Sequence, residues 1–459
     1  MGPHPSLLPT RWSGEGAPAH FTNIKAGVIG AGKSGLAAAR LLRRLGAQVL
    51  LSEKGVFKGA RPAGITIEEG GHSRRLLQSQ LLIRSPGVPN RLPILRAAAR
   101  KKIPLWSEIE LAARVLPARA TLIAITGTNG KTTTTTLAGE IFKASGRPTR
   151  VGGNIGTPLA DLAGRITART AVVLEMSSYQ LEDIHAFHPR LSAILNITPD
   201  HLEHHGTLRA YAAAKARIFM NQTRRDVCVL NADDAGCRRL ARRCPARIFW
   251  FSRKKTLSSG VYLKDGNVHL RWPGRTQQWP LKTLLPGPHN AENVLAAIAI
   301  AVAGGVGLAK LRRVLERFPG VEHRLEHVRT IAGADYVNDS KGTNVDSTRV
   351  ALASFARPIL LIAGGQGKGS PYAPLRAAVK QRVRKLLLIG EDAPRLAREL
   401  GASAPYENLK TMARAVARAR ALAQAGDVVL LSPACASFDQ YQNYEHRGRD
   451  FKTLVRRLK

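Results

Sequence analysis

The sequence predicts an α/β protein with three domains, each a mostly parallel sheet flanked by helices. Apolar runs, Gly-rich turns and helical segments alternate along almost the whole chain, which is typical of parallel strands joined by covering helices. The 459 residues exceed what one compact core accommodates, and an apolar content of 44% is enough to bury several. Pro-rich joints at Leu116-Pro117 and Phe318-Pro319-Gly320 place the predicted domains at residues 24–116, 117–319 and 320–459.

The segment before the first apolar run, residues 1–23, mixes Pro, Gly, His and Ser without a hydrophobic stretch. We therefore expect a disordered leader there and no secretory signal. No run approaches the roughly 18 apolar residues of a membrane helix. The cysteines lack the paired short spacing of a zinc site, which is typical of reduced thiols; they are Cys228, Cys237, Cys244 and Cys435. These features predict a cytoplasmic protein without membrane insertion.

The composition is strongly basic, with a formal net charge of +38 at pH 7. A positive field favours anionic partners, so a nucleic-acid-binding protein is one alternative. The arginines, however, are scattered among alanines on helix-like stretches, as at Arg414, Arg418 and Arg420, and aromatic residues are only 5%. This pattern favours solvated helix faces, and we expect no nucleic-acid partner.

The first block opens with a strand at residues 26–29 and a Gly-Ala-Gly-Lys-Ser-Gly turn at residues 30–35, which leads into a helix. Glu53 closes the next strand at a distance that suits a ribose-binding acid. Taken by itself, this pattern predicts a Rossmann-like dinucleotide site and leaves an NAD-dependent oxidoreductase open. That alternative gives no role to the glycine loop of the second block.

The second block carries a strand at residues 121–125, the loop Gly127-Thr-Asn-Gly-Lys131-Thr132 and a helical run through Lys143. Glycines let backbone N–H groups face a phosphate, Lys131 adds a full positive charge, and Thr132 supplies a hydroxyl for Mg²⁺. Ile125 stands where the strict phosphate-loop pattern has glycine, and a plain Gly-rich turn is the alternative. The strand before and the helix after the loop favour phosphate binding.

Two later strands of this block end in polar residues. The strand at residues 171–174 runs into Glu175, a carboxylate that suits a hard cation shared with Thr132. The strand at residues 191–195 leads to Asn196 and His201, and this histidine is as readily structural as a ligand. Ligands of open α/β sheets bind outside the carboxyl ends of the strands, so we expect these side chains to meet. The third block repeats the alternation, with strands expected at residues 359–363, 385–389 and 428–431.

The ordered motifs together resemble the Mur ligases, a family related to folylpolyglutamate synthases. The shared elements are Gly127-Thr-Asn-Gly-Lys-Thr132, Glu175, the stretch from Asn196 to His201, Lys215, Gly287-Pro-His-Asn290, Asn293 and His323-Arg324. The resemblance covers nearly the whole chain after the leader. It implies a Rossmann-like N-terminal domain, a central ATPase domain of the P-loop type and a Rossmann-like C-terminal domain.

Four segments resemble the glutamate-adding members of that family. They are Asn154-Ile-Gly156, Asn338-Asp-Ser-Lys-Gly-Thr-Asn344, Gly364-Gly-Gln-Gly-Lys368 and the run from Ser432 to Tyr441. The Asp-Asn-Pro-Arg motif of the diaminopimelate-adding relatives does not occur. The resemblance implies an ATP-dependent ligase that adds D-glutamate to UDP-N-acetylmuramoyl-L-alanine through an acyl phosphate, in peptidoglycan precursor synthesis. A different amino-acid specificity, such as L-glutamate, stays open.

We expect the protein to be a monomer. The resemblance also implies roles for individual residues. The catalytic group comprises Lys131, His201 and Lys215, and two Mg²⁺ ions are held by Thr132, Glu175, His201 and a carbamylated Lys215. ATP is bound by Gly127, Thr128, Asn129, Gly130, Lys131, Thr132, Thr133, Asn293, Arg324, Asp339 and Lys341. The UDP-substrate is bound by Gly30, Ser34, Gly35, Ser85, Gly87, Asn154, Ser177 and Gln180, and glutamate by Thr343, Lys368, Ser437, Phe438 and Tyr444. Ser52-Glu53-Lys54 departs from the family's Asp-Thr-Arg uracil contact, so the uracil contacts stay open, and Cys435 is expected to pack rather than to react.

Overall fold

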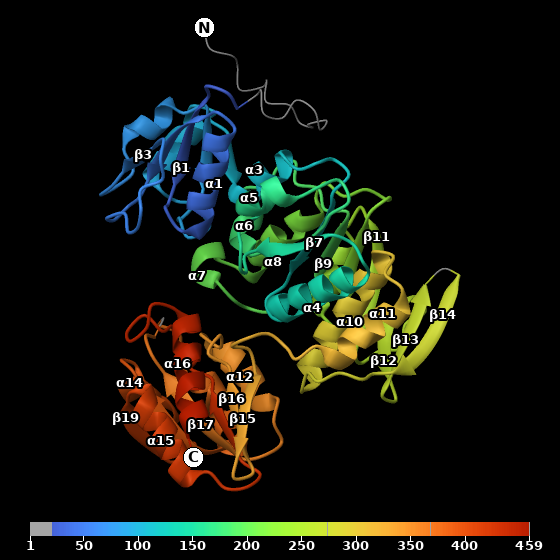
Figure 1. Ribbon diagram of the computed structural model, residues 1–459, viewed down its shortest axis with the longest axis vertical. Helices are drawn as coiled ribbons and strands as arrows, with labels where there is room; N and C mark the ends of the chain where they lie inside the picture. The colour runs from blue at the N-terminus through green and yellow to red at the C-terminus, as the bar shows by residue number, and fades with distance from the viewer. Residues whose placement is uncertain (1–20, 273, 368, 459) are drawn as a thin grey trace. The chain divides into compact units, whose positions relative to one another are not determined.

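The computed structural model of the chain describes residues 21–272, 274–367 and 369–458, so residues 1–20 of the predicted leader lie outside it. Three sheets with helices on their faces confirm the predicted α/β class (Figure 1). The chain forms two compact units. One comprises the residues up to Lys282 with Glu292–Leu315 and holds the first two sheets; the other comprises Thr283–Ala291 and the residues from Glu316 and holds the third. The three domain boundaries remain a prediction.

The first sheet has five parallel strands in the order β3-β2-β1-β4-β5. Its elements are β1 (Lys25–Ile29), α1 (Lys33–Arg44), β2 (Gln48–Ser52), β3 (Ile65–Glu68), the 3-10 helix η3 (Arg74–Gln78), β4 (Leu81–Arg84), α2 (Pro93–Arg100), β5 (Leu105–Ser107) and α3 (Glu108–Arg114). Phe21 is buried and Asn23 N donates to Gly46 O (2.9 Å), so packed structure already begins within residues 21–23.

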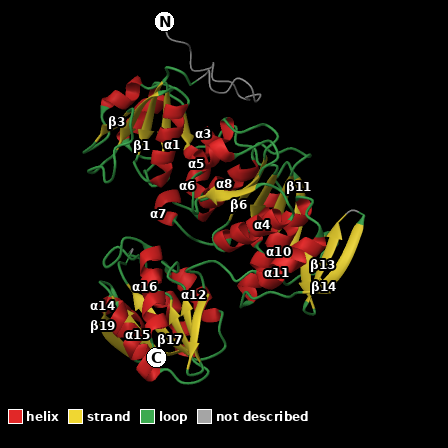
Figure 2. Cartoon of the chain, viewed as in Figure 1, coloured by secondary structure: helices red, strands yellow, loops and turns green. Residues whose placement is uncertain are grey.

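The central sheet has nine strands in the order β14-β13-β12-β11-β10-β9-β6-β8-β7 and is antiparallel only at its β12–β14 edge. Figure 2 labels β13 and β14 of this edge. Its strands are β6 (Thr121–Thr126), β7 (Thr149–Gly153), β8 (Ala171–Glu175), β9 (Leu191–Ile194), β10 (Val227–Asn231), β11 (Arg247–Ser252), β12 (Gly260–Lys264), β13 (Asn267–Trp272) and β14 (Arg275–Pro280). The helices that follow its strands are α4 (Lys131–Ala144), α5 (Leu159–Leu162), α6 (Ser178–Glu182), α7 (Leu202–His205), α8 (Leu208–Ala216), α9 (Ala235–Ala241), α10 (Pro288–Ala303) and α11 (Leu308–Arg317), with η4 (Ala163–Arg165) and η5 (Arg217–Phe219).

The third sheet has six strands in the order β15-β16-β20-β17-β18-β19, and only the β15–β16 pair is antiparallel. Its strands are β15 (Glu326–Ile331), β16 (Ala334–Asn338), β17 (Ile359–Gly364), β18 (Val383–Ile389), β19 (Tyr406–Lys410) and β20 (Val428–Leu431). Its helices are α12 (Val345–Ala353), η6 (Ala373–Leu375), α13 (Arg376–Arg382), α14 (Ala393–Leu400), α15 (Met412–Leu422) and α16 (Tyr444–Arg457).

The middle strands are continuous apolar runs because both faces of each sheet are covered. Strands β8, β10 and β17 are buried at every position. One hydrophobic cluster extends from the first sheet through α1, α3 and α5 to the central sheet, which explains why these two sheets share a compact unit. The third sheet has a separate cluster on each face.

The surface agrees with the expectation of solvated basic faces. On α15, Arg414 and Arg418 are exposed and Arg420 is half-buried, whereas the alanines between them, Ala415 and Ala419, are buried. Among the described residues, no helix is both long enough and apolar enough to cross a membrane.

Candidate active site

A glycine loop joins β6 to α4, the strand and helix expected around it. Gly130 has φ +82°, and a Cβ there would lie 2.0 Å from Asn293 Oδ1, so this position requires glycine. The same contact places Asn293 of α10 against the loop. Lys131 Nζ donates to Gly127 O (3.0 Å) and Thr128 O (2.8 Å), so the ammonium group lies over the loop it follows.

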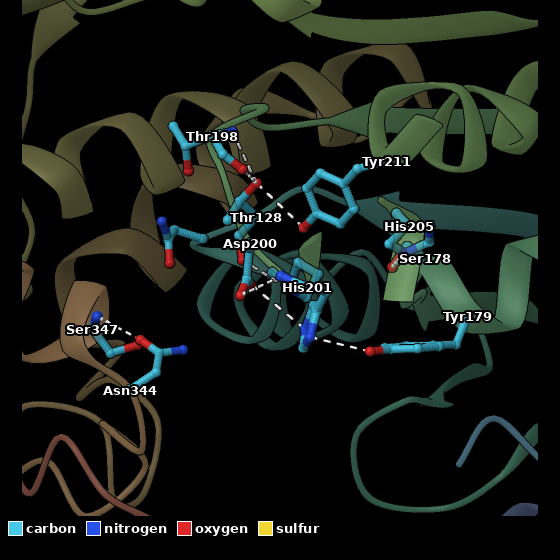
Figure 3. Close-up of polar contacts among 12 residues, drawn as sticks. Thr128, Ser178, Tyr179, Thr198, Asp200, His201, His205, Tyr211, Asn344 and Ser347 are labelled. Carbon is cyan, nitrogen blue, oxygen red and sulfur yellow. Dashed lines mark hydrogen bonds and ion pairs between the residues drawn. The ribbon is translucent and has the colours of Figure 1, made fainter. Parts of the chain in front are cut away.

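Asn196, two residues after the end of β9, fixes the shape of this loop. Its Oδ1 accepts hydrogen bonds from Thr128 N (3.0 Å) and Asn129 N (2.8 Å). Thr128 Oγ1 donates to Thr198 O (3.1 Å) and accepts from Thr198 N (3.0 Å) (Figure 3). A side chain from the neighbouring strand thus holds the loop in one conformation.

Glu175 ends β8 and lies beside the start of α4. Because β6 and β8 are parallel neighbours with Ile125 opposite Glu175, their carboxyl ends meet at one edge. Glu175 is 2% exposed; its Oε2 accepts from Thr132 Oγ1 (2.8 Å) and its Oε1 from Asn154 Nδ2 (2.7 Å). Hydroxyl and carboxylate oxygens are the ligands that Mg²⁺ prefers, so these residues fit the metal that the family resemblance implies.

Lys215 reaches the same edge from α8. It is 1% exposed, its Nζ donates to Gly127 O (2.8 Å), and it lies 4.5 Å from the centre of the Tyr211 ring. Burial and then the charge of Lys131 lower the pKa of Lys215 well below its usual range, although Asp200 and Glu175 act in the opposite direction. The lowered pKa shifts Lys215 toward the neutral amine, which is the form that reacts with CO₂ to give a carbamate.

His201 precedes α7 and is half-exposed. Its φ is +52°, its Nδ1 lies 3.2 Å from Tyr179 Oη, and its Nε2 lies 3.5 Å from Asp200 Oδ2. The Tyr179 ring also contacts the rings of His204 (4.5 Å between centroids) and His205 (5.7 Å). The strand end after β9 therefore carries a cluster of histidines around one tyrosine.

A cavity of about 700 Å³ opens beside these groups. This volume lies within the range of small-molecule sites. It is lined by Pro86, Gly87, Val88, Pro89, Asn90, Arg91, Lys131, Asn154, Ser177, Ser178, Tyr179, His201, Glu203, His204, Tyr211 and Lys215. The structure thus brings together groups from the end of β4, the glycine loop, the ends of β7 and β8, and helices α6 to α8.

The glycine turn after β1 is tightly packed. A Cβ on Gly35 would lie 1.9 Å from Gly30 O, and one on Gly30 (φ +89°) would lie 2.6 Å from Val88 Cγ2. Glu53, the predicted ribose-binding acid, accepts a hydrogen bond from Ala31 N at its Oε2 (2.7 Å). Ser34 lies in the first turn of α1, and Ser85 N donates to Ile29 O (3.0 Å), so the two predicted segments are neighbours.

Within the second compact unit, Asp339 organises the predicted nucleotide residues. It is fully buried, and it accepts hydrogen bonds from Ser432 Oγ (2.8 Å) and Arg324 Nη1 (3.3 Å). Burial raises the pKa of Asp339 although Arg324 acts to lower it. Lys341 Nζ lies 5.6 Å from the centre of the Tyr444 ring, which joins a predicted nucleotide residue to a predicted glutamate residue.

The predicted glutamate segments are also adjacent within this unit. Gln366 and Ala436 exchange backbone hydrogen bonds (3.0 and 2.9 Å), which pairs the glycine loop after β17 with the segment before Ser437. Arg447 is buried and donates to Ser340 O (2.9 Å) and Ala436 O (3.1 Å). Ser437 is buried and Phe438 is exposed; Thr343 N donates to Lys341 O (2.9 Å). Lys368 lies outside the described residues.

Cys435 packs as expected for a non-reactive thiol. It is fully buried with its Sγ 2.9 Å from Tyr372 Oη, and burial raises its pKa to about 11. All cysteines of the described residues are free thiols.

Some cavity residues were not singled out from the sequence. Tyr211 lies four residues before Lys215 on the same helix face, a spacing that could have indicated it. Tyr179 and His204 carried no such signal, because their places depend on the packing of α6 against α7. Gln180, which was predicted to bind the UDP-substrate, is buried. Its Oε1 accepts a hydrogen bond from Ser177 N (3.0 Å) in the N-terminal cap of α6.

Family models match more than half of the chain. The Mur ligase middle domain matches residues 125–301, and the Mur ligase, glutamate ligase domain matches residues 323–435. The chain belongs to the Mur ligase family. The resemblance inferred from the motifs is therefore confirmed. Membership of this family excludes the alternative that the chain is an NAD-dependent oxidoreductase.

Individual Mur ligases cover almost all of the chain. The UDP-N-acetylmuramoylalanine–D-glutamate ligase of Koribacter versatilis is 46% identical over 441 residues, which are 94% of this chain and 97% of that protein. The ligase of the same name from Myxococcus xanthus is 45% identical over 446 residues, 94% and 98% of the two chains.

Solved structures show the shared fold. The pseudomurein peptide ligase type C of Methanothermus fervidus has a TM-score of 0.60 at 18% identity and covers 95% of this chain and 100% of its own. The UDP-N-acetylmuramate-alanine ligase of Thermotoga maritima has a TM-score of 0.60 at 20% identity, with 95% and 99% covered.

Proposed function

We propose that this Mur ligase uses ATP to join D-glutamate to UDP-N-acetylmuramoyl-L-alanine, a step of peptidoglycan precursor synthesis. The observation that carries the proposal is the glycine loop whose Thr132 shares a hydrogen bond with Glu175 (2.8 Å) beside a substrate-sized cavity. The relatives named for D-glutamate addition, at 46% and 45% identity over 94% of the chain, favour D-glutamate over L-glutamate.

The reaction has two steps. A carboxylate oxygen of the substrate's alanine attacks the γ-phosphorus, ADP leaves, and an acyl phosphate forms. The amine of glutamate then attacks the carbonyl carbon, loses a proton, and phosphate leaves with the bridging oxygen. Both steps concentrate negative charge, so Lys131 and the backbone N–H groups of the loop would act by electrostatic stabilisation and positioning.

Thr132 and Glu175 would hold one Mg²⁺, and His201 with a carbamylated Lys215 a second. When bound, Mg²⁺ would supply positive charge that offsets the negative charge of the phosphate and acyl oxygens. The neutral amine of Lys215 would add to CO₂ and release a proton, which replaces a cation by a hard anionic ligand.

The remaining residues would bind the substrates. The UDP-substrate would contact the glycine turn after β1 and the cavity residues Gly87, Asn154 and Ser177. Asn293, Arg324, Asp339 and Lys341 would contact ATP, and Thr343, Ser437, Phe438 and Tyr444, with Lys368, would contact glutamate.

Phosphate release tests the proposal directly. The protein is mixed with ATP, Mg²⁺ and UDP-N-acetylmuramoyl-L-alanine, and D-glutamate, L-glutamate, diaminopimelate and lysine are added in turn. We expect turnover with D-glutamate and a product heavier by one glutamyl residue. ATP consumption that ignores the muramoyl nucleotide would contradict the proposal.

A further inference from the structure

Arg84, the last residue of β4, joins three acceptors behind the cavity. It is 2% exposed, and it donates from Nη1 to Val88 O (3.1 Å), from Nε to Asp183 Oδ2 (2.6 Å) and from Nη2 to Glu182 Oε2 (2.7 Å). Val88 belongs to a loop of the first sheet, whereas Glu182 and Asp183 end α6 of the central sheet. One buried side chain therefore connects the two sheets at the cavity.

On one side, Arg84 fixes the loop at residues 86–91. This loop lines the cavity, and the Val88 carbonyl that accepts from Arg84 belongs to it. The Val88 side chain in turn lies so close to Gly30 that a Cβ there would approach Val88 Cγ2 to 2.6 Å. The anchored loop therefore also supports the glycine turn after β1.

On the other side, Glu182 transmits the contact to α7. Its Oε1 accepts a hydrogen bond from His204 Nε2 (2.8 Å), while its Oε2 accepts one from Arg84 Nη2. Burial acts to raise the pKa of Glu182, but the hydrogen bonds from Arg84 and His204 lower it below its usual value. Glu182 is thus a charged bridge between Arg84 and His204, which lines the cavity.

We infer that Arg84 is a positioning residue that sets the two walls of the cavity relative to each other. It does so through the Val88 carbonyl on one wall and the Glu182–His204 pair on the other. The planar guanidinium can reach three acceptors in fixed directions, which a lysine ammonium on a flexible stem cannot reproduce. The inference rests on the proposed function, because it takes the cavity as the place of the UDP-substrate.

Arg40 provides a matched control. It also connects the first sheet to the central one, through Nε (3.2 Å) and Nη2 (2.7 Å) to Asp161 on α5. The Arg40 side chain is 45% exposed, and neither Arg40 nor Asp161 lines the cavity. The variants are Arg84→Lys, Glu182→Gln and Arg40→Lys, and the measurements are KM for the UDP-substrate, KM for ATP, kcat, and the Kd of UDP by calorimetry.

We expect Arg84→Lys to raise KM for the UDP-substrate and the Kd of UDP at least ~10-fold, with KM for ATP changed by less than about 2-fold. Glu182→Gln keeps the size of the acceptor but removes its charge, so a smaller rise in the same direction is expected. If Arg84→Lys does not fold, Glu182→Gln still tests the positioning role of Arg84. Arg40→Lys should change neither constant by more than about 2-fold.

Three results would overturn the inference: an unchanged KM for the UDP-substrate in folded Arg84→Lys or Glu182→Gln, an equal loss for both substrates, or an Arg40→Lys effect of the same size. These results differ from a failure of the proposed function, in which the wild-type protein would show no response of ATP consumption to the muramoyl nucleotide.

Discussion

The two glycine turns of the first compact unit look alike in sequence and differ in the partner that the neighbouring strand supplies. After β1, Glu53 accepts a hydrogen bond from the backbone N–H of Ala31 (2.7 Å). After β6, Glu175 accepts instead from the side chains of Thr132 and Asn154 (2.8 and 2.7 Å). The Glu53 carboxylate occupies a backbone N–H that would otherwise be available to a phosphate. The Glu175 carboxylate lies beside a hydroxyl, and the oxygens of both groups can bind a cation.

This difference explains why the first turn alone was ambiguous. A strand, a glycine turn and a following acid predicted a dinucleotide site as readily as any other nucleotide site. At the second turn, Glu175 accepts hydrogen bonds from side chains rather than from the backbone of the turn, and the turn itself carries Lys131 and Thr132. The chemistry of a glycine turn is therefore decided by the residue types at the ends of adjacent strands.

The largest expected effect comes from the second turn. Lys131→Ala removes the only full charge on the loop, and we expect phosphate release to fall by ~10³-fold, since preorganised charge usually contributes that much or more. Glu53→Gln, at the first turn, should leave kcat within about 3-fold and act mainly on KM for the UDP-substrate. Steady-state phosphate release measures both. Comparable losses of kcat in the two variants would remove the distinction between the turns.

Replacing Lys215 tests whether this edge carries an anionic ligand. Lys215→Ala should abolish most turnover, and a short carboxylic acid such as acetate should restore part of it, because it supplies the oxygens that the carbamate would have supplied. Carbon-13 NMR of wild-type protein under labelled CO₂ gives an independent readout. Wild-type activity in Lys215→Ala, or rescue absent together with no carbamate signal, would refute this assignment.

The packing of the first turn gives a stability prediction. Gly35→Ala brings a Cβ to within 1.9 Å of Gly30 O, whereas a Cβ on Gly32 has its nearest neighbour at 3.7 Å. We expect Gly35→Ala to lower the free energy of unfolding by ~1–3 kcal/mol and to weaken UDP binding. Gly32→Ala should be close to neutral in both. Denaturant unfolding with UDP titration separates the two variants, and an equal effect would mean that the turn is not closely packed.

Glu108 is a buried carboxylate that lacks the partners of Glu175. Glu108 Oε1 accepts from Ala160 N (2.6 Å), but its Oε2 has no hydrogen-bond partner among the described residues. Burial raises the pKa of Glu108 to about 8, so the folded protein keeps a proton that the unfolded chain loses near the ordinary value of 4.5. Stability contributed by this group is present below pH 4.5 and is lost as pH rises to about 8.

Glu108→Gln removes this pH dependence because the amide does not titrate. We expect the variant to be more stable than wild type by up to ~4–5 kcal/mol at pH 8.5 and nearly equal at pH 4. Thermal unfolding across this pH range measures the difference. A constant difference at all pH values would show that Glu108 is not protonated in the folded protein.

The sequence predicted the parts of the site that depend on local pattern. The strands before Glu175 and Asn196 are where the apolar runs placed them, and Lys131 begins a helix as expected. The histidine cluster around Tyr179 and the contacts of Arg84 were not predicted, because they join residues about 100 positions apart or depend on helix packing. Gln180 was expected at the substrate, but its local role as a cap of α6 depends on the exact helix start.

Transfer of the γ-phosphoryl group to the alanine carboxylate can be followed with an oxygen isotope. UDP-N-acetylmuramoyl-L-alanine labelled with ¹⁸O in its terminal carboxylate is turned over with ATP and D-glutamate, and the released phosphate is analysed by mass spectrometry. An acyl phosphate requires each released phosphate to carry one oxygen from the carboxylate. Phosphate without label would mean that no acyl phosphate forms.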